Sequence, residues 1–110
     1  YVFTYDPDCF AGLPTGEFIK ALEAEGIPTQ ASYPSLHALD LFKNGEYLKR
    51  LLPEHASEQK PYRDEDFSVT EVGFRNSVWV VHRALLGDEQ DTNEIVEAVR
   101  KIQRQAKTIK

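Results

Sequence analysis

Apolar residues in the first third of the chain follow first an extended pattern, then a helical one, then an extended one. Aromatic and β-branched side chains dominate residues 1–5, which predicts a β-strand. Phe18 and Leu22 lie one helical turn apart, which predicts a helix that begins after Thr15 and is stopped by Gly26. A second extended segment is expected over residues 27–33.

The last third of the chain carries the two strongest patterns. Residues 77–81 form a nearly continuous apolar run, which predicts a strand buried on both faces. Residues 68–76 are predicted to form a short helix before it. A long helix from residue 91 onward has apolar side chains at helical spacing along one face. They are Ile95, Ala98, Val99, Ile102, Ala106 and Ile109.

Polar residues near the predicted helix ends indicate how those helices begin. Thr15 is the expected N-cap of the first helix. Asp91 and Glu94 have the spacing of a capping box at the start of the last one. Glu97 and Lys101 stand four residues apart, acid before base, which predicts an ion pair on the solvent face.

The middle of the chain has no clear periodicity. Residues 38–43 are expected to form one short helical turn. Residues 44–66 are polar and irregular, and they predict a long loop with one turn of helix near residues 47–52. The element order indicates an α/β (α+β) two-layer sandwich, with helices packed on a small, mainly antiparallel sheet of about three strands. We expect residues 1–110 to form a single domain.

Composition places the chain in the globular class. Of its 110 residues, 41% are hydrophobic and 28% are charged, and the net charge is -5. The acidic balance argues against nucleic acid or an anionic membrane surface as the main partner. No apolar run approaches the roughly 20 residues that span a bilayer. Cys9 is the only cysteine, so no internal disulfide is possible, and a reducing, cytoplasmic location is expected.

The first residues suggest an incomplete protein. The sequence contains no methionine, and the first predicted strand begins at Tyr1. We therefore expect this chain to be a domain cut from a larger enzyme.

Most catalytic signatures are absent from the sequence. It has neither a Gly-x-Gly-x-x-Gly fingerprint nor a phosphate loop. The possible metal ligands weighed are Cys9, His37, His55 and His82, and no two of them have helical ligand spacing, so no metal site is predicted. Cys9 is expected to be a small buried residue; the alternative is a nucleophile paired with a histidine.

His37 is the strongest candidate for a binding residue. It follows a predicted strand end, in a proline-containing loop that also holds Tyr33. Such loops commonly carry binding groups, and imidazole can donate or accept a hydrogen bond near neutral pH. The alternative is a histidine that only packs or faces solvent.

Three segments together resemble the DegT/StrS-type sugar aminotransferases. Residues 31–37 (ASYPSLH), followed by Leu41-Phe42, are similar to a Tyr/His-Pro-Leu-His loop of that family. Residues 78–88 (VWVVHRALLGD) resemble its last strand and turn, and residues 91–102 resemble its closing helix. The resemblance covers nearly the whole chain in the same order. Ser35 and Asp40 depart from the usual pattern of the loop.

The resemblance implies the C-terminal small domain of a fold-type I enzyme dependent on pyridoxal phosphate. Such enzymes move an amino group from glutamate or glutamine to a keto-sugar or keto-cyclitol, and they are homodimers. The cofactor, its lysine and the catalytic residues belong to a large domain outside this chain. Tyr33 and His37 would then be substrate-binding, and no catalytic or cofactor-binding residue is assigned here. By itself this chain is expected to be inactive and to bind no cofactor.

Two other hypotheses stay open at this point. A small α/β sandwich can act as a stand-alone binding or regulatory module without catalysis. A small cysteine-dependent enzyme that uses Cys9 is the weaker possibility.

Overall fold

A computed structural model describes residues 1–43, 45–58 and 62–109. The chain divides into two compact units. Unit 1 joins Tyr1–Ser32 with Arg75–Lys110, so its two halves come from opposite ends of the sequence. Unit 2 is the intervening segment Tyr33–Phe74.

Unit 1 contains the sheet. Its strands are β1 (Val2–Thr4), β2 (Thr29–Ala31) and β3 (Ser77–Val80), in the order β1-β3-β2. Both neighbours run antiparallel to β3, with Phe3 opposite Val78 and Thr29 opposite Val80. The predicted fold class is thus confirmed: a mixed α/β fold with a three-stranded antiparallel sheet in the described residues.

The two faces of β3 are buried to different degrees. Val78 and Val80 are buried, whereas Ser77 and Trp79 are half-buried. Successive side chains of a strand point to opposite faces, so the two valines share the face that joins the core. The predicted burial on both faces is therefore complete for the face of the two valines and partial for the face that carries Ser77 and Trp79.

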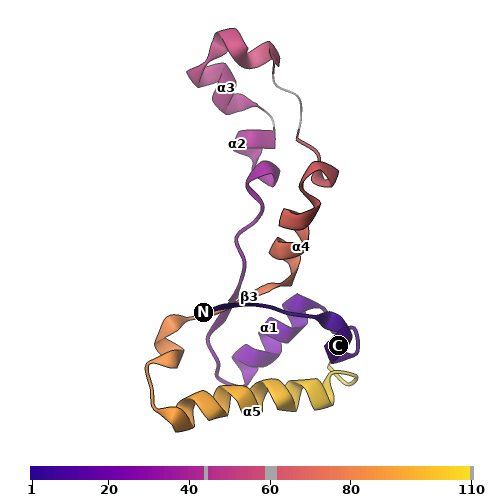
Figure 1. Cartoon of the computed structure of the whole chain (residues 1–110), viewed down its shortest axis with the longest axis vertical. Helices are drawn as coiled ribbons and strands as arrows, with labels where there is room; N and C mark the ends of the chain where they lie inside the picture. The colour runs from indigo at the N-terminus through magenta and orange to yellow at the C-terminus, as the bar shows by residue number, and fades with distance from the viewer. Residues whose placement is uncertain (44, 59–61, 110) are drawn as a thin grey trace. The chain divides into compact units, whose positions relative to one another are not determined.

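Helix α1 (Thr15–Ala24) packs on β2, β3 and the last helix (Figure 1). It buries Phe18 and Leu22, as the sequence pattern predicts, and also Ile19, which that pattern does not include. Thr15 is the first helical residue rather than the N-cap, because Pro14 takes the cap position with extended backbone. The Pro14 carbonyl accepts the N–H groups of Glu17 and Phe18, each at 3.0 Å.

The end of α1 explains the glycine that follows it. Gly26 has a φ of +86°, a left-handed conformation that costs glycine little. Its N–H bonds the Glu23 carbonyl, and the Ile27 N–H bonds the Leu22 carbonyl at 2.9 Å. These two bonds form a Schellman motif, which satisfies carbonyls that the helix leaves open.

Three aromatic rings form the centre of the core. The rings of Tyr5 and Phe18 stack with centroids 4.3 Å apart, and Phe10 meets Phe18 edge-on at 5.0 Å. The Tyr5 hydroxyl donates to the Leu13 carbonyl at 2.8 Å. Burial, with smaller contributions from Asp6 and Cys9, raises the pKa of Tyr5 to about 12, so the phenol stays a donor at physiological pH.

Helix α5 (Glu89–Gln105) confirms the long helix predicted near the end of the chain. Ala98 and Ile102, together with Ala106 just past its end, are buried in the core. The predicted capping pair, Asp91 and Glu94, lies three residues too late in the sequence. Asp88 is the N-cap, its side chain accepts from the N–H of Asp91 at 3.1 Å, and the Asp91 carboxylate accepts from the Asp88 N–H at 3.0 Å.

The ion pairs made by charged residues of α5 also differ from the predicted one. Glu97 accepts from Arg100 at 2.7 Å, not from Lys101. Lys101 Nζ instead donates to both carboxylate oxygens of Glu25, each at 2.8 Å. The second contact is tertiary, because Glu25 is the C-cap residue of α1. Surface ion pairs of this kind each contribute little, typically about 0–1 kcal/mol.

Unit 2 is built from short helices. They are η2 (Leu36–Ala38), α2 (Asp40–Lys43), α3 (Glu46–Leu51), η3 (Pro53–Glu58), η4 (Asp64–Phe67) and α4 (Ser68–Asn76), whose last two residues belong to unit 1. The helical turns predicted over 38–43 and 68–76 are confirmed. The helical turn predicted near residues 47–52 is confirmed by α3, whereas the loop predicted for the rest of 44–66 is wrong for most of its described residues, which form short helices. Residues 44 and 59–61 of that prediction lie outside the described residues.

In the described parts of the chain, every helix is too short or too polar to cross a membrane.

Replacing Phe18 with alanine should destabilise unit 1 by about 3–5 kcal/mol, because the substitution leaves a cavity between Tyr5 and Phe10. The free energy of unfolding in urea measures this loss. Leu86→Ala is the control, since Leu86 is 75% exposed and its truncation should cost no more than about 0.5 kcal/mol. Equal losses in the two variants would contradict the assigned core.

Candidate functional site

The two residues that the sequence singles out for binding lie at opposite ends of one short loop in unit 2. The Tyr33 side chain is exposed at the start of unit 2. His37 belongs to the 3-10 helix η2 and is buried, with 7% of its surface exposed. Ser35 between them is also buried, and its hydroxyl has no hydrogen-bond partner. The loop therefore presents one solvent-facing phenol and buries the imidazole.

His37 is held between an aromatic ring and two carboxylates. Its ring stacks on Phe67 at a centroid distance of 4.4 Å and an interplanar angle of 14°. Its Nε2 lies 3.3 Å from Asp64 Oδ1 and 3.3 Å from Glu71 Oε1. The three groups come from η2, the start of η4 and the first turn of α4, and we call them the His37 cluster.

The contacts in the His37 cluster are close in distance but do not satisfy hydrogen-bond geometry. Both carboxylates lie within ion-pair range, yet the buried Nε2 has no hydrogen-bond partner. The two contacts are therefore weak, because alignment as well as distance determines the strength of a hydrogen bond. Three possible ligand atoms, one from each residue, all lie within 4.8 Å of one another.

The sequence indicates His37 but not its two acidic neighbours. Asp64 and Glu71 lie far from His37 along the chain, in segments where acidic residues are frequent. Metal-ligand spacing of cysteine and histidine does not point to these two carboxylates. No local sequence signal identifies them, since the cluster arises from the packing of three separate short helices.

Cys9 does not have the environment of a nucleophile. It is exposed, so the prediction of a buried cysteine is wrong. Its thiol donates to Asp6 Oδ2 at 3.4 Å. This hydrogen bond, followed by the negative charge of Asp6, raises the pKa of the Cys9 thiol above its usual value. Reactive cysteines have a lowered pKa, so this environment works against a cysteine-dependent enzyme.

The lysines of the described residues do not form a site for pyridoxal phosphate. The cofactor needs a lysine beside a pocket that encloses its ring and phosphate. Every lysine that the structure describes is exposed, and Lys20 and Lys101 are paired with Glu17 and Glu25.

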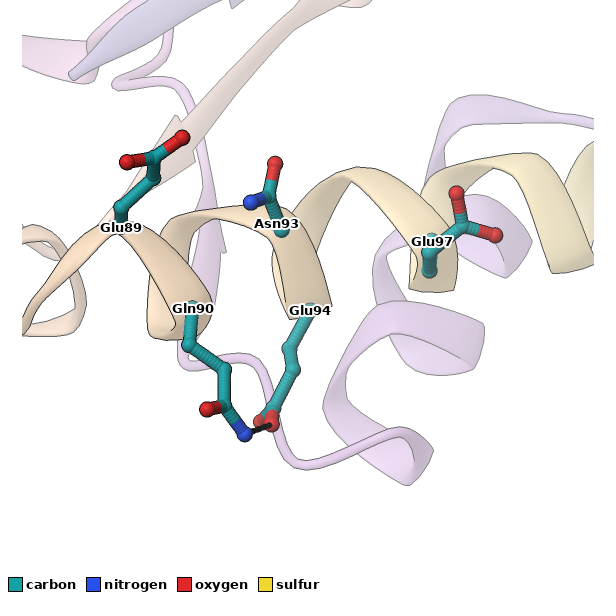
Figure 2. Close-up of a pocket in the computed structure, with 5 residues that line it drawn as sticks. All are labelled: Glu89, Gln90, Asn93, Glu94 and Glu97. Carbon is teal, nitrogen blue, oxygen red and sulfur yellow. Dashed lines mark hydrogen bonds between the residues drawn. The ribbon is translucent and has the colours of Figure 1, made fainter.

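A shallow depression along α5 is lined by five polar side chains (Figure 2). They are Glu89, Gln90, Asn93, Glu94 and Glu97. Figure 2 shows Gln90 and Glu94 on one side of the helix, joined by a hydrogen bond of 3.3 Å, and the other three on the opposite side. These side chains do not converge on a common point, so we interpret the depression as a solvated helix face.

Unit 1 also has an apolar hollow of about 640 Å³. Its wall includes Phe3 and Val80 from the sheet and Ile95 and Val99 from α5. Arg100 is a charged residue that also lines the hollow. A volume of this size accommodates a small molecule, and the mostly apolar wall favours an apolar one.

Comparison with known proteins gives matches to aminotransferases. The chain is 32% identical over 104 residues to a Streptomyces kanamyceticus protein named as an L-glutamine:3-amino-2,3-dideoxy-scyllo-inosose aminotransferase. A Streptoalloteichus tenebrarius protein of the same name is 30% identical over 106 residues. The L-glutamine:2-deoxy-scyllo-inosose aminotransferase of S. tenebrarius is 35% identical over 106 residues.

These matches cover almost all of this chain but only part of each relative. They span 92–94% of the chain and 25–26% of the relatives, so the chain corresponds to about a quarter of their length. The matching part is their C-terminal quarter. No family model matches the chain, and no solved structure matches it.

Alkylation of Cys9 should be slow at mildly alkaline pH, because a raised pKa leaves less of the thiol as reactive thiolate. Asp6→Asn removes the carboxylate, which should lower the pKa and speed the reaction. Asp8→Asn is the control. Asp8 makes the smallest contribution to the raised pKa of Cys9, so its loss should change the alkylation rate less than Asp6→Asn does. Rates of iodoacetamide modification across pH measure the pKa in each variant. An unchanged pKa in Asp6→Asn would contradict this assignment.

Proposed function

Because this chain is homologous to the C-terminal quarter of DegT/StrS-type scyllo-inosose aminotransferases, we propose that it works as the C-terminal small domain of such an enzyme. The single observation that supports this most is the match to three aminotransferases over at least 92% of the chain. The mixed α/β fold with its antiparallel sheet is compatible with that role.

The proposed reaction is the transfer of an amino group to a keto-cyclitol or a related keto-sugar. The names of all three relatives give L-glutamine as the donor and a scyllo-inosose as the acceptor, so we favour glutamine over glutamate. Pyridoxal phosphate would carry the amino group between the two substrates. A large domain of the same enzyme, outside this chain, would hold the cofactor and its lysine.

Within that enzyme, we assign the loop that carries Tyr33 and His37 to the substrate side. The exposed Tyr33 phenol is the group positioned for direct contact, since a hydroxyl can donate to or accept from a cyclitol hydroxyl. His37 would not contact the substrate directly. Its buried imidazole, stacked on Phe67, would fix the position of the end of the loop. The phenol would then contribute to orientation and affinity rather than to a covalent step.

The surface of unit 2 supports a larger assembly. Several large apolar side chains of this small unit are exposed to solvent. Their number is higher than expected for a surface with only scattered apolar residues. They include Leu36, Leu41, Leu51, Val69 and Val72. We propose that the large domain, or the second subunit of a homodimer, covers them in the complete enzyme.

A second function is favoured by one observation, the apolar hollow of unit 1. A stand-alone module could bind a small apolar metabolite there without catalysis. The two proposals differ in what the chain does alone, since only the module would bind its ligand tightly without a further domain.

The chain by itself should neither attach pyridoxal phosphate nor transfer an amino group, because the lysines described in it lie in exposed positions. Incubation with the cofactor, borohydride reduction and mass spectrometry would detect attachment. Activity would be detected as transfer of the amino group of glutamine to 2-deoxy-scyllo-inosose. Stoichiometric attachment at one lysine with turnover would overturn the assignment to a domain that lacks the cofactor site.

A chimera gives the positive test. The C-terminal quarter of the S. tenebrarius 2-deoxy-scyllo-inosose aminotransferase is replaced by this chain. We expect the chimera to retain cofactor and to aminate the keto-cyclitol. Tyr33→Phe in the chimera should lower kcat/KM for the cyclitol about two- to tenfold, the loss of one hydrogen bond worth about 0.5–1.5 kcal/mol.

Tyr1→Phe is the matched control for that variant, because Tyr1 is 71% exposed and Tyr33 is 75% exposed. It should leave kcat/KM unchanged. A folded chimera without activity would count against the proposed function. An active chimera in which Tyr33→Phe has no effect would remove only the role of Tyr33.

A further inference from the structure

We propose that the His37 cluster binds one divalent metal ion of the zinc class, with His37, Asp64 and Glu71 as its ligands. All three residues belong to unit 2, and the site does not depend on the proposed aminotransferase function. The proposal depends on three observations: the spacing of the ligand atoms, the buried imidazole nitrogen without a hydrogen bond, and the charge of the cluster.

The spacing fits a common metal ion better than it fits direct contact. Zinc lies about 2.0–2.1 Å from imidazole nitrogen and carboxylate oxygen, so two ligands at a tetrahedral angle are about 3.3 Å apart. His37 Nε2 lies 3.3 Å from Asp64 Oδ1 and 3.3 Å from Glu71 Oε1. Both separations match the edge of such a tetrahedron.

A protonated imidazole that pairs directly with the carboxylates would have a different geometry. Charge-assisted N–H···O contacts are typically about 2.7–2.9 Å long and well aligned. Both contacts of Nε2 are longer than this, and the atom has no hydrogen-bond partner. A metal ion explains this arrangement, because all three residues then direct lone pairs at one point instead of at one another.

Burial and charge support the same assignment. The His37 side chain is 5% exposed, so an unsatisfied nitrogen there costs free energy unless something occupies its lone pair. Asp64 and Glu71 beside the imidazole supply carboxylate oxygens of the kind that bind a divalent cation. The Asp64 side chain is 74% exposed, which gives an ion a path from solvent. The Phe67 ring stacked on the imidazole limits how far His37 can rotate away.

The ligand set indicates which ions to expect. Calcium and magnesium favour sites built from oxygen atoms, whereas one imidazole with two carboxylates suits zinc or cobalt(II). Three protein ligands would leave one tetrahedral position to water or to a further ligand. An ion in this position would link η2, η4 and α4, and would therefore stabilise unit 2 by mass action.

The test is a titration of the tag-free, full 110-residue chain with zinc, followed by calorimetry, and with cobalt(II), followed by visible absorption. We expect one strong site per chain, a tetrahedral cobalt spectrum and a higher melting temperature with zinc. Asp64→Asn and Glu71→Gln should each weaken zinc binding about tenfold or more, as should His37→Ala, and the melting shift should shrink with them.

Asp66→Asn is the matched control, because Asp66 lies in the same helix η4 but pairs with Arg63 at 3.0 Å. Its zinc affinity should stay within about twofold of the parent chain, and Cys9→Ser should behave in the same way. If His37→Ala fails to fold by circular dichroism, Asp64→Asn decides, since that side chain is largely exposed. Equal affinities in Asp64→Asn and Asp66→Asn, or only weak binding at several sites, would overturn the proposal.

Discussion

The pairing of β3 with both other strands is the constraint on which unit 1 depends. β1 and β2 contribute only three residues each, and β3 alone brings them into one sheet. The ladder extends to the first residue, where the Val80 N–H donates to the Tyr1 carbonyl at 2.8 Å. A sheet this small gains its stability from packing rather than from its hydrogen bonds. The helices α1 and α5 matter because they bury the face that carries Val78.

Much of this fold follows from the sequence, and the exceptions have physical reasons. Apolar periodicity is a property of each segment by itself, so it locates α1, α5 and β3 within a few residues. The choice of Asp88 over Asp91 as N-cap depends on where the chain first turns, which periodicity does not specify. Lys101 pairs with Glu25 because α1 and α5 are neighbours in space, a contact that a helix considered in isolation does not contain.

The candidate site also has one part that the sequence predicts and one part that it does not. The loop that carries Tyr33 and His37 can be recognised from its proline, its histidine and its position after a strand. Asp64 and Glu71 join His37 only once three short helices have packed, so the cluster is not a property of any one segment of the sequence. Sequence patterns therefore predict the scaffold of this protein better than they predict the polar contacts made on it.

The order of the two units along the chain has a consequence for how such a protein can change over evolution. Unit 1 is closed by residues from both ends of the chain, and unit 2 is inserted between them. Lengthening an inserted segment costs a folded scaffold little, since each doubling of a flexible loop adds only about 0.6 kcal/mol of closure entropy. A change in the length of unit 2 therefore costs the closure of unit 1 little entropy. Lineages that share the sheet are free to diverge in the segment that carries Tyr33 and His37.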